Sequence, residues 1–205
     1  MRRTLLILMV LAGAVGLQRG CEQREVSSRP GIAVRAAPQQ AALAPEEARP
    51  FDHGGYRIEP QAAYQIRARL LAREAYHLGR EAELSPVDFA LGWGPMSDPS
   101  VLAGLSISQS GRFFWVRWAA EPPIPPAQIF IHAANTHLIP ADDTVRRALD
   151  RMRPGHVVHL QGSLVNLSAP DGWRWNSSLV RDDMGAGACE LFWVTRAWID
   201  NDTKT

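Results

Sequence analysis

Hydrophobic and polar residues alternate in the stretch from Tyr64 to Ala72. Ile66, Ala68 and Leu70 fall on one side of this stretch, and Gln65, Arg67 and Arg69 fall on the other. A period of two residues is typical of a half-buried β-strand. A helix that starts after Pro60 is the alternative, because alanine, leucine and arginine all favour helices. The alternation predicts a strand.

Two further segments, 105–109 and 112–118, flank the dipeptide Ser110-Gly111. A two-residue link that contains glycine is typical of a β-hairpin. The second segment is rich in phenylalanine and tryptophan, so we expect a strand with both faces largely covered. The sequence therefore predicts a hairpin here.

Two short helices are expected after the hairpin. One covers residues 127–134. The other can be capped by Asp142 or Asp143, and it ends at Pro154 and Gly155. Aspartate at the start and the Pro-Gly pair at the end are ordinary helix boundaries.

The last part of the domain reads as strands again, at 158–164, from Trp173 onward and at 188–199. Several short strands with two small helices predict an α+β fold. Its expected form is a small, mostly antiparallel, β-barrel-like domain with two short helices, formed by residues 54–199.

The first 50 residues do not share this pattern. Arg2 and Arg3 precede the uncharged run 4–17, which is too short to span a bilayer but suits the core of a signal peptide. Residues 1–21 are therefore expected to be a signal segment, or a lipoprotein signal that ends at Cys21. Residues 22–50 lack a sustained apolar period and predict a disordered tether. The expected location is the periplasm, or the membrane with the domain facing the periplasm or exterior.

Composition excludes some partners. The chain has 22 basic and 21 acidic residues, which gives a net charge of +1. It therefore has no excess positive field to attract nucleic acid, and no nucleic acid is expected as a partner. The 46% of hydrophobic residues is enough for one domain with a core. The expected partner is an unknown envelope ligand or protein.

Two stretches concentrate polar residues, and together they resemble a known family. The first, HAANTHLIP, contains Asn135, His137 and Leu138. The second, SSLVRDDMGAGACE, contributes Ser177, Ser178, Arg181, Asp183, Gly185, Gly187, Ala188, Cys189 and Glu190. The pair is similar to a family of exported or membrane-anchored bacterial proteins of unassigned function. The resemblance covers about residues 54–198 and implies no activity.

These polar residues include the groups of a thiol site. Cysteine attacks as its thiolate, which a nearby histidine or arginine favours. We expect Cys189 as nucleophile, His137 as its base, Arg181 as a positive neighbour, and Asn135 or Asp183 to orient the imidazole. Acyl transfer or hydrolysis is the corresponding reaction. The order of histidine, helix, strand and cysteine loosely resembles sortases, but Arg181 precedes the cysteine here instead of following it.

Other interpretations stay open for the same residues. Cys189 can be a buried structural thiol beside Leu191 and Trp193, or form a disulfide with Cys21. No cofactor and no metal are expected, because the chain has no paired Cys-x-x-Cys and no complete nucleotide loop. The alternative function is a non-catalytic barrel that binds a glycan, peptide or protein at the cell envelope, using exposed tryptophans.

Overall fold

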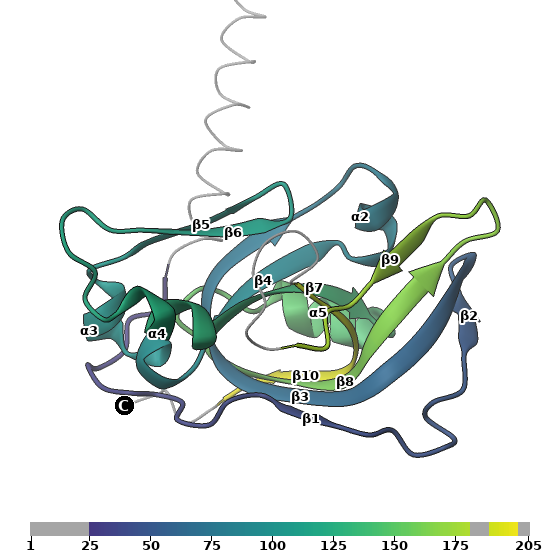
Figure 1. Ribbon diagram of the computed structural model, residues 1–205, viewed down its shortest axis with the longest axis horizontal. Helices are drawn as coiled ribbons and strands as arrows, with labels where there is room; N and C mark the ends of the chain where they lie inside the picture. Colours follow the sequence, from purple (N-terminus) through teal and green to yellow (C-terminus); the bar gives the residue numbers. More distant parts are fainter. Residues whose placement is uncertain (1–24, 181–188, 201–205) are drawn as a thin grey trace, which may run out of the picture.

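The computed structural model describes residues 25–180 and 189–200 (Figure 1). It confirms the α+β class: ten strands and four short α-helices are present in these ranges, and the strands predominate. The strands are β1 (Gln39–Ala41), β2 (Phe51–His53), β3 (Tyr56–Ala75), β4 (Val87–Gly92), β5 (Ser106–Ser110), β6 (Phe113–Arg117), β7 (Ala133–Pro140), β8 (Val157–Ser168), β9 (Arg174–Asn176) and β10 (Glu190–Ile199). The helices are α2 (Arg80–Leu84), α3 (Pro99–Leu102), α4 (Pro126–Ile131) and α5 (Asp143–Asp150), with a 3-10 turn η1 (Gly94–Ser97).

The long curved strand β3 organises the sheet. Its first two thirds pair with β8 and its last third pairs with β4, both antiparallel. Irregular register at Pro60/Ala62 and at Leu70/Ala72 marks bulges, where an extra residue bends a strand. The strand predicted at 64–72 is therefore confirmed as part of β3, and the helical alternative is excluded.

The remaining strands complete an eight-stranded mixed sheet. β4 pairs with β7 and β10 pairs with β8, both antiparallel, whereas β7 and β10 run parallel. β8 and β10 approach closely at Gly162, where an added Cβ would lie 1.9 Å from the carbonyl oxygen of Trp193. A glycine is required at this crossing, because no side chain fits there.

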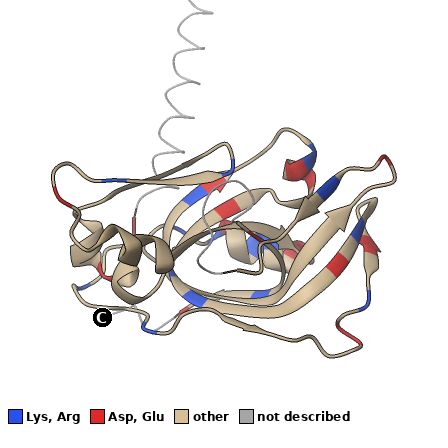
Figure 2. Cartoon of the chain, in the orientation of Figure 1, with Lys and Arg blue, Asp and Glu red and all other residues tan. Residues whose placement is uncertain are grey.

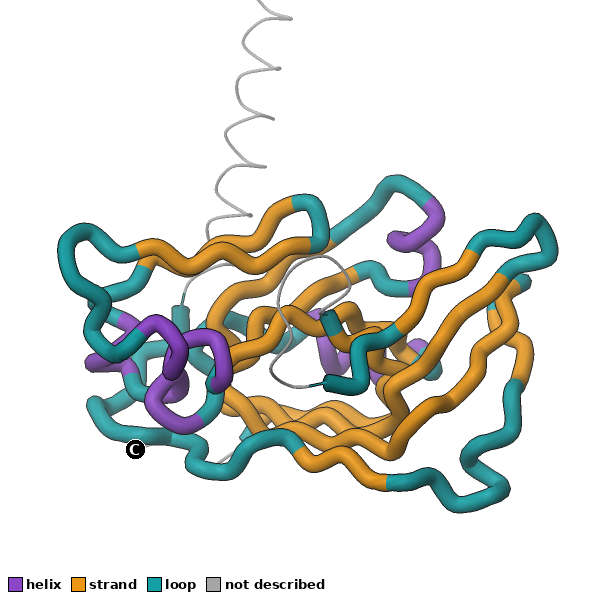
Figure 3. Tube along the Cα trace, viewed as in Figure 1, coloured by secondary structure: helices purple, strands orange, loops and turns teal. Residues whose placement is uncertain are grey.

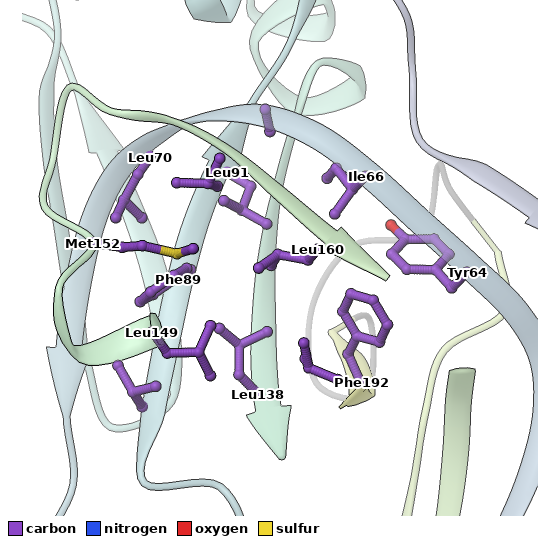
Figure 4. Close-up of a cluster of buried hydrophobic side chains, with 14 of the residues drawn as sticks. Tyr64, Ile66, Leu70, Phe89, Leu91, Leu138, Leu149, Met152, Leu160 and Phe192 are labelled. Atoms are coloured by element: carbon purple, nitrogen blue, oxygen red, sulfur yellow. The ribbon is translucent and has the colours of Figure 1, made fainter. Parts of the chain in front are cut away.

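The main core lies on one side of this sheet (Figure 4). Phe89, Leu138 and Leu160 point into it from three strands, and Leu149 and Met152 cover it from α5 and the turn that follows. A second, smaller cluster contains Tyr56, Ile58, Leu84, Ile139, Val165, Leu167 and Leu191. Because Leu138 and Ile139 are neighbours in β7, the two clusters lie on opposite faces of that strand.

Both predicted helices are present, but the expectation of only two was wrong. α5 begins as predicted, with the carboxylate of Asp142 accepting a hydrogen bond from Val145 N at 2.8 Å. α4 occupies most of 127–134. α2, α3 and η1 are additional. Each has only four or five residues, which is too short for a recognisable helical period.

The segment expected to be a disordered tether is packed on the domain from residue 25 onward. Val34 is 1% exposed within the main core, and Val26 N donates to Pro154 O at 2.8 Å. β1 adds antiparallel to β3. Backbone hydrogen bonds and one inserted valine hold this segment, so it needs no periodic apolar pattern. Residues 22–24 and the signal segment lie outside the described residues.

The predicted hairpin is present as β5 and β6, which form a separate two-stranded ribbon (Figures 1 and 3). Its link is Gly111-Arg112, one residue later than expected, with φ angles of 58° and 71°. Positive φ at both positions is typical of the type I′ turn that suits a tight hairpin. The expectation that both faces of β6 are covered was wrong, since Phe113 is 43% and Trp115 is 48% exposed.

Candidate functional site: a thiol, an imidazole and a carboxylate

Three strands bring the candidate residues together by register. Asp88 in β4 is the direct partner of His137 in β7 across their antiparallel pair. Leu191 in β10 is the partner of His137 on the parallel side. Cys189 comes immediately before β10 and therefore lies beside Asn135, two residues before His137. All of these side chains lie on the face of β4 and β7 opposite the main core.

His137 lies between a carboxylate and the thiol. Its Nδ1 is 2.9 Å from Asp88 Oδ2, and Cys189 is the other neighbour that acts on its pKa. Since Nδ1 faces Asp88, Nε2 is the ring nitrogen left for the thiol. Burial acts to lower the pKa of His137, but the bonds and charges of Asp88 and Cys189 outweigh burial and raise this pKa to about 9. The imidazolium form is therefore favoured at neutral pH.

Arg112 holds the other side of Asp88. Its Nη1 donates to Asp88 Oδ1 at 2.7 Å, and its Nη2 donates to Ser85 O at 2.9 Å. The guanidinium also lies over the ring of Tyr76, 3.9 Å from the centroid. These contacts fix the tip of the β5–β6 hairpin on the sheet, and they hold Arg112 in its left-handed backbone conformation.

Tyr76 completes this anchor of the hairpin tip. Its hydroxyl accepts a hydrogen bond from Arg112 N at 3.0 Å. Burial is the main cause that raises the pKa of Tyr76 to about 12, and the charge of Asp88 adds to it. The phenol is therefore neutral at neutral pH, so its oxygen serves here as an acceptor.

Asn135 connects the hairpin to the thiol. Its Nδ2 donates to the carbonyl of Arg112 at 3.0 Å and to Cys189 Sγ at 3.6 Å. Its Oδ1 accepts from Gln109 Nε2 at 2.6 Å. Because the Arg112 carbonyl can only accept, Nδ2 must face it, and this fixes the amide orientation of both Asn135 and Gln109.

The cluster is buried except at the thiol. Asp88 is 0%, His137 5% and Asn135 7% exposed, whereas Cys189 is half-buried. Trp175 in β9 covers the imidazole, with ring centroids 5.0 Å apart. Low solvent access strengthens the charge interactions of such a group.

Of the residues expected from the sequence, the structure brings Cys189, His137 and Asn135 together. Asn135 lies beside the thiol rather than orienting the imidazole. Arg181 and Asp183 lie outside the described residues. Cys189 is a free thiol that accepts a hydrogen bond from Asn135. Cys21, its expected alternative partner in a disulfide, lies outside the described residues.

Sequence reasoning missed Asp88 and Arg112, which orient the imidazole and hold its carboxylate. A signal for Asp88 was present, because it is the one charged residue in the apolar run Val87–Gly92. A buried charge in such a run requires a partner. Arg112 gave a weaker signal as a large residue directly after the glycine of a tight turn.

Charge and membrane features add little to this site. Basic and acidic positions are interspersed over the cartoon (Figure 2). In the part of the chain that the structure describes, no set of three His, Cys, Asp or Glu side chains is arranged to hold a metal ion. No helix within 25–180 or 189–200 has the length and apolar character to cross a membrane.

Comparisons with known proteins identify no relative: no family model matches the chain, and searches of curated proteins and of solved structures find no match. The geometry of the site is thus the basis for any functional argument.

Proposed function

We propose that this protein is a cell-envelope thiol enzyme of the acyl-transfer or hydrolase type, with Cys189 as nucleophile, His137 as general base and Asp88 as the group that orients the base. One observation carries the proposal: the His137 imidazole lies 2.9 Å from a buried carboxylate and beside a half-buried thiol, and both neighbours raise its pKa. A nucleophile, a base and a group that orients the base are the parts that covalent catalysis requires.

The reaction follows from these roles. His137 is an imidazolium at neutral pH, so the proposed attacking form is the Cys189 thiolate paired with it, and this thiolate attacks the carbonyl carbon of an ester or amide. The carbonyl oxygen takes the negative charge of the tetrahedral intermediate. When the intermediate collapses, the leaving group takes the proton from His137, and a thioester remains on Cys189. Water or an amine then attacks the thioester and gives a proton to the now neutral His137, and the C–S bond breaks, which releases the acyl group and restores the thiolate.

Asn135 and Arg112 support this reaction in different ways. The second N–H of Asn135 points at the thiol sulfur, so it is close to the oxygen that becomes negative during attack. Arg112 binds the carboxylate oxygen that does not face His137, which leaves Asp88 Oδ2 for the imidazole. We assign Asn135 to the developing charge and Arg112 to the position of Asp88.

The location belongs to the same proposal. Two arginines and the uncharged run 4–17 support export, and retention of that segment or lipidation of Cys21 would keep the domain at the membrane.

A binding module is the second candidate function. The strand pairings lead from β3 through β4, β7, β10 and β8 back to β3, which supports a barrel-like arrangement. Small barrels that bind oligosaccharides or oligonucleotides use the face of their second and third strands. The corresponding strands here are β4 and β7, and the face opposite the main core carries Trp175 over His137. A glycan, peptide or protein partner fits this interpretation.

Alkylation of Cys189 tests the proposed reaction. The full chain with Cys21→Ser carries one thiol, and we expect iodoacetamide to label it in the native state at pH 7. His137→Gln should slow the labelling about tenfold or more, because the base that favours the thiolate is lost. His159→Gln is the matched control, since His159 also contacts a carboxylate, Asp200, at 3.3 Å.

Two outcomes would contradict the reaction. The first is labelling that occurs only after denaturation. The second is equal labelling rates in His137→Gln and the native chain. Incubation with p-nitrophenyl acetate separates an enzyme from a binding module. The enzyme should gain one acetyl group on Cys189 and then lose it with the help of His137, as followed by intact mass.

A further inference from the structure

A groove lies next to the proposed site, between the end of β3 and the hairpin strand β5. Its volume is about 610 Å³, and its walls include Leu71, Arg73 and His77 on one side and Ile107 and Gln109 on the other. β5 runs beside β3 but pairs only with β6 among the described strands (Figures 1 and 3). One edge of β5 therefore faces the groove without a strand partner.

The hairpin geometry shows which backbone groups face the groove. In a hairpin with a two-residue turn, the residues that flank the turn exchange backbone hydrogen bonds, and the bonded pairs then recur at every second residue. Ser110 flanks the turn, so Ser110, Ser108 and Ser106 bond to β6. The N–H and C=O groups of Ile107 and Gln109 point to the opposite edge, into the groove.

These outward groups have no protein partner within 25–180 and 189–200, although Gln109 is only 9% exposed. Unpaired N–H and C=O groups along the edge of a strand are a template for pairing with another chain. Ile107 and Gln109 are two residues apart, which is the repeat of an extended chain. The edge of β5 thus offers the hydrogen bonds that an added strand would make.

Gln109 also links this edge to the thiol. Gln109 lines the groove, and its side chain donates to Asn135 Oδ1 at 2.6 Å. Asn135 in turn donates to Cys189 Sγ at 3.6 Å. A chain bound along β5 would therefore contact the residue that positions Asn135 beside the nucleophile.

We propose that the groove binds an extended polypeptide segment, which adds as a third strand to the edge of β5, and that such segments are the substrate class of Cys189. The assignment of substrate rests on the proposed function, whereas the binding site does not. Arg73, Glu74 and His77 give the groove walls mixed charge, so recognition relies on the peptide backbone more than on one kind of side chain.

The test uses the full chain with Cys21→Ser and Cys189→Ser, so that binding is measured without chemistry. A displayed library of random dodecapeptides is selected on this protein, and the best peptide is then synthesised. We expect Ile107→Pro to weaken its binding about tenfold, because one backbone donor is lost. Ile107→Ala is the matched control, since it keeps the donor, and it should change binding much less.

Two further measurements keep the test independent of how well Ile107→Pro folds. When the backbone nitrogens of the peptide are methylated one at a time, binding should be lost at every second position and kept at the positions between them. In hydrogen exchange, the amides of Ile107 and Gln109 should exchange fast in the free protein and slowly in the complex. The amide of Ser108 should be protected in both states, because it bonds to β6.

The proposal would be overturned if no peptide is selected, if N-methylation is tolerated at every position, or if the two amides still exchange fast in the complex. Protection of these amides by dimerisation without peptide would also overturn it, because the occupant would be a second copy of the chain. If peptides bind as expected but Cys189 is unreactive, the proposed reaction fails and the binding site stands.

Discussion

The two faces of β4 and β7 both carry buried side chains, but those side chains make different kinds of interaction. On the inner face, Phe89 and Leu138 are both 0% exposed and belong to the apolar core. On the outer face, Asp88 is 0% and His137 5% exposed, and each requires a charged or hydrogen-bonding partner. Successive residues of the same strands therefore need different surroundings: apolar packing on the inner face and polar partners on the outer face.

The difference shows what each face can do. On an apolar face, the volume of the side chains determines which residues fit, so hydrophobic residues of similar volume can replace one another at a modest cost in stability. On a buried polar face, the directions of the hydrogen bonds determine which residues fit, because each donor must meet its acceptor at the right angle. Such a face contributes less net stability, but it holds reactive groups in one arrangement. We expect substitutions on the two faces to differ in size, in pH dependence and in their effect on the thiol.

The largest expected effect is on the inner face. Phe89→Ala should lower the free energy of unfolding by about 3 to 5 kcal/mol, because it leaves a cavity in the main core. Denaturant unfolding measures this loss, and the residual folded protein should still label at Cys189. Phe113→Ala is the matched control, since Phe113 is 43% exposed, and it should cost less than about 1 kcal/mol. Equal losses for the two variants would contradict the contrast between core and surface.

The next effect is the pH dependence of the outer face. The pKa of His137 is raised from 6.5 to about 9 in the folded state, so its pairing stabilises the protein fully below pH 6.5. This contribution is lost as pH rises through about 9, and it amounts to about 3 kcal/mol. The destabilisation by Asp88→Asn should therefore shrink between pH 6.5 and pH 9.5.

Unfolding by urea across this pH range checks the expectation. Phe89→Ala serves as the reference, because its cavity contains no titrating group and its destabilisation should stay constant with pH. A cost of Asp88→Asn that is equally constant would show that His137 does not titrate with Asp88 as its partner.

Local patterns explain which parts of the fold could be predicted. The alternation in β3, the aspartate cap of α5 and the glycine of the β5–β6 turn all lie within a few residues of the element they specify. The packing of residues 25–41 could not be predicted in this way. It depends on backbone bonds to distant strands and on Val34 entering a core formed elsewhere in the chain.

The same reasoning applies to the site. Cys189, His137 and Asn135 were found because they stand in polar stretches that a simple strand does not need. Asp88 is 24 residues from Arg112 along the chain, and their contact depends on where the hairpin folds over the sheet. No periodicity in the sequence encodes that position, so the orienting carboxylate became evident only from the strand register.

The smallest expected effect concerns Arg112, where the outer face meets the hairpin. Arg112→Lys keeps the charge, but an ammonium cannot reproduce the fork that binds Asp88 Oδ1 and Ser85 O together. We expect a loss of about 1 to 2 kcal/mol and faster hydrogen exchange at the hairpin tip. Cys189 labelling should also slow, because Arg112 O anchors the side chain of Asn135. Arg117→Lys, at the exposed far end of β6, is the matched control and should change neither measurement. If Arg112→Lys matched that control, the hairpin tip would be held by packing alone, and the direction of the guanidinium bonds would not be part of the site.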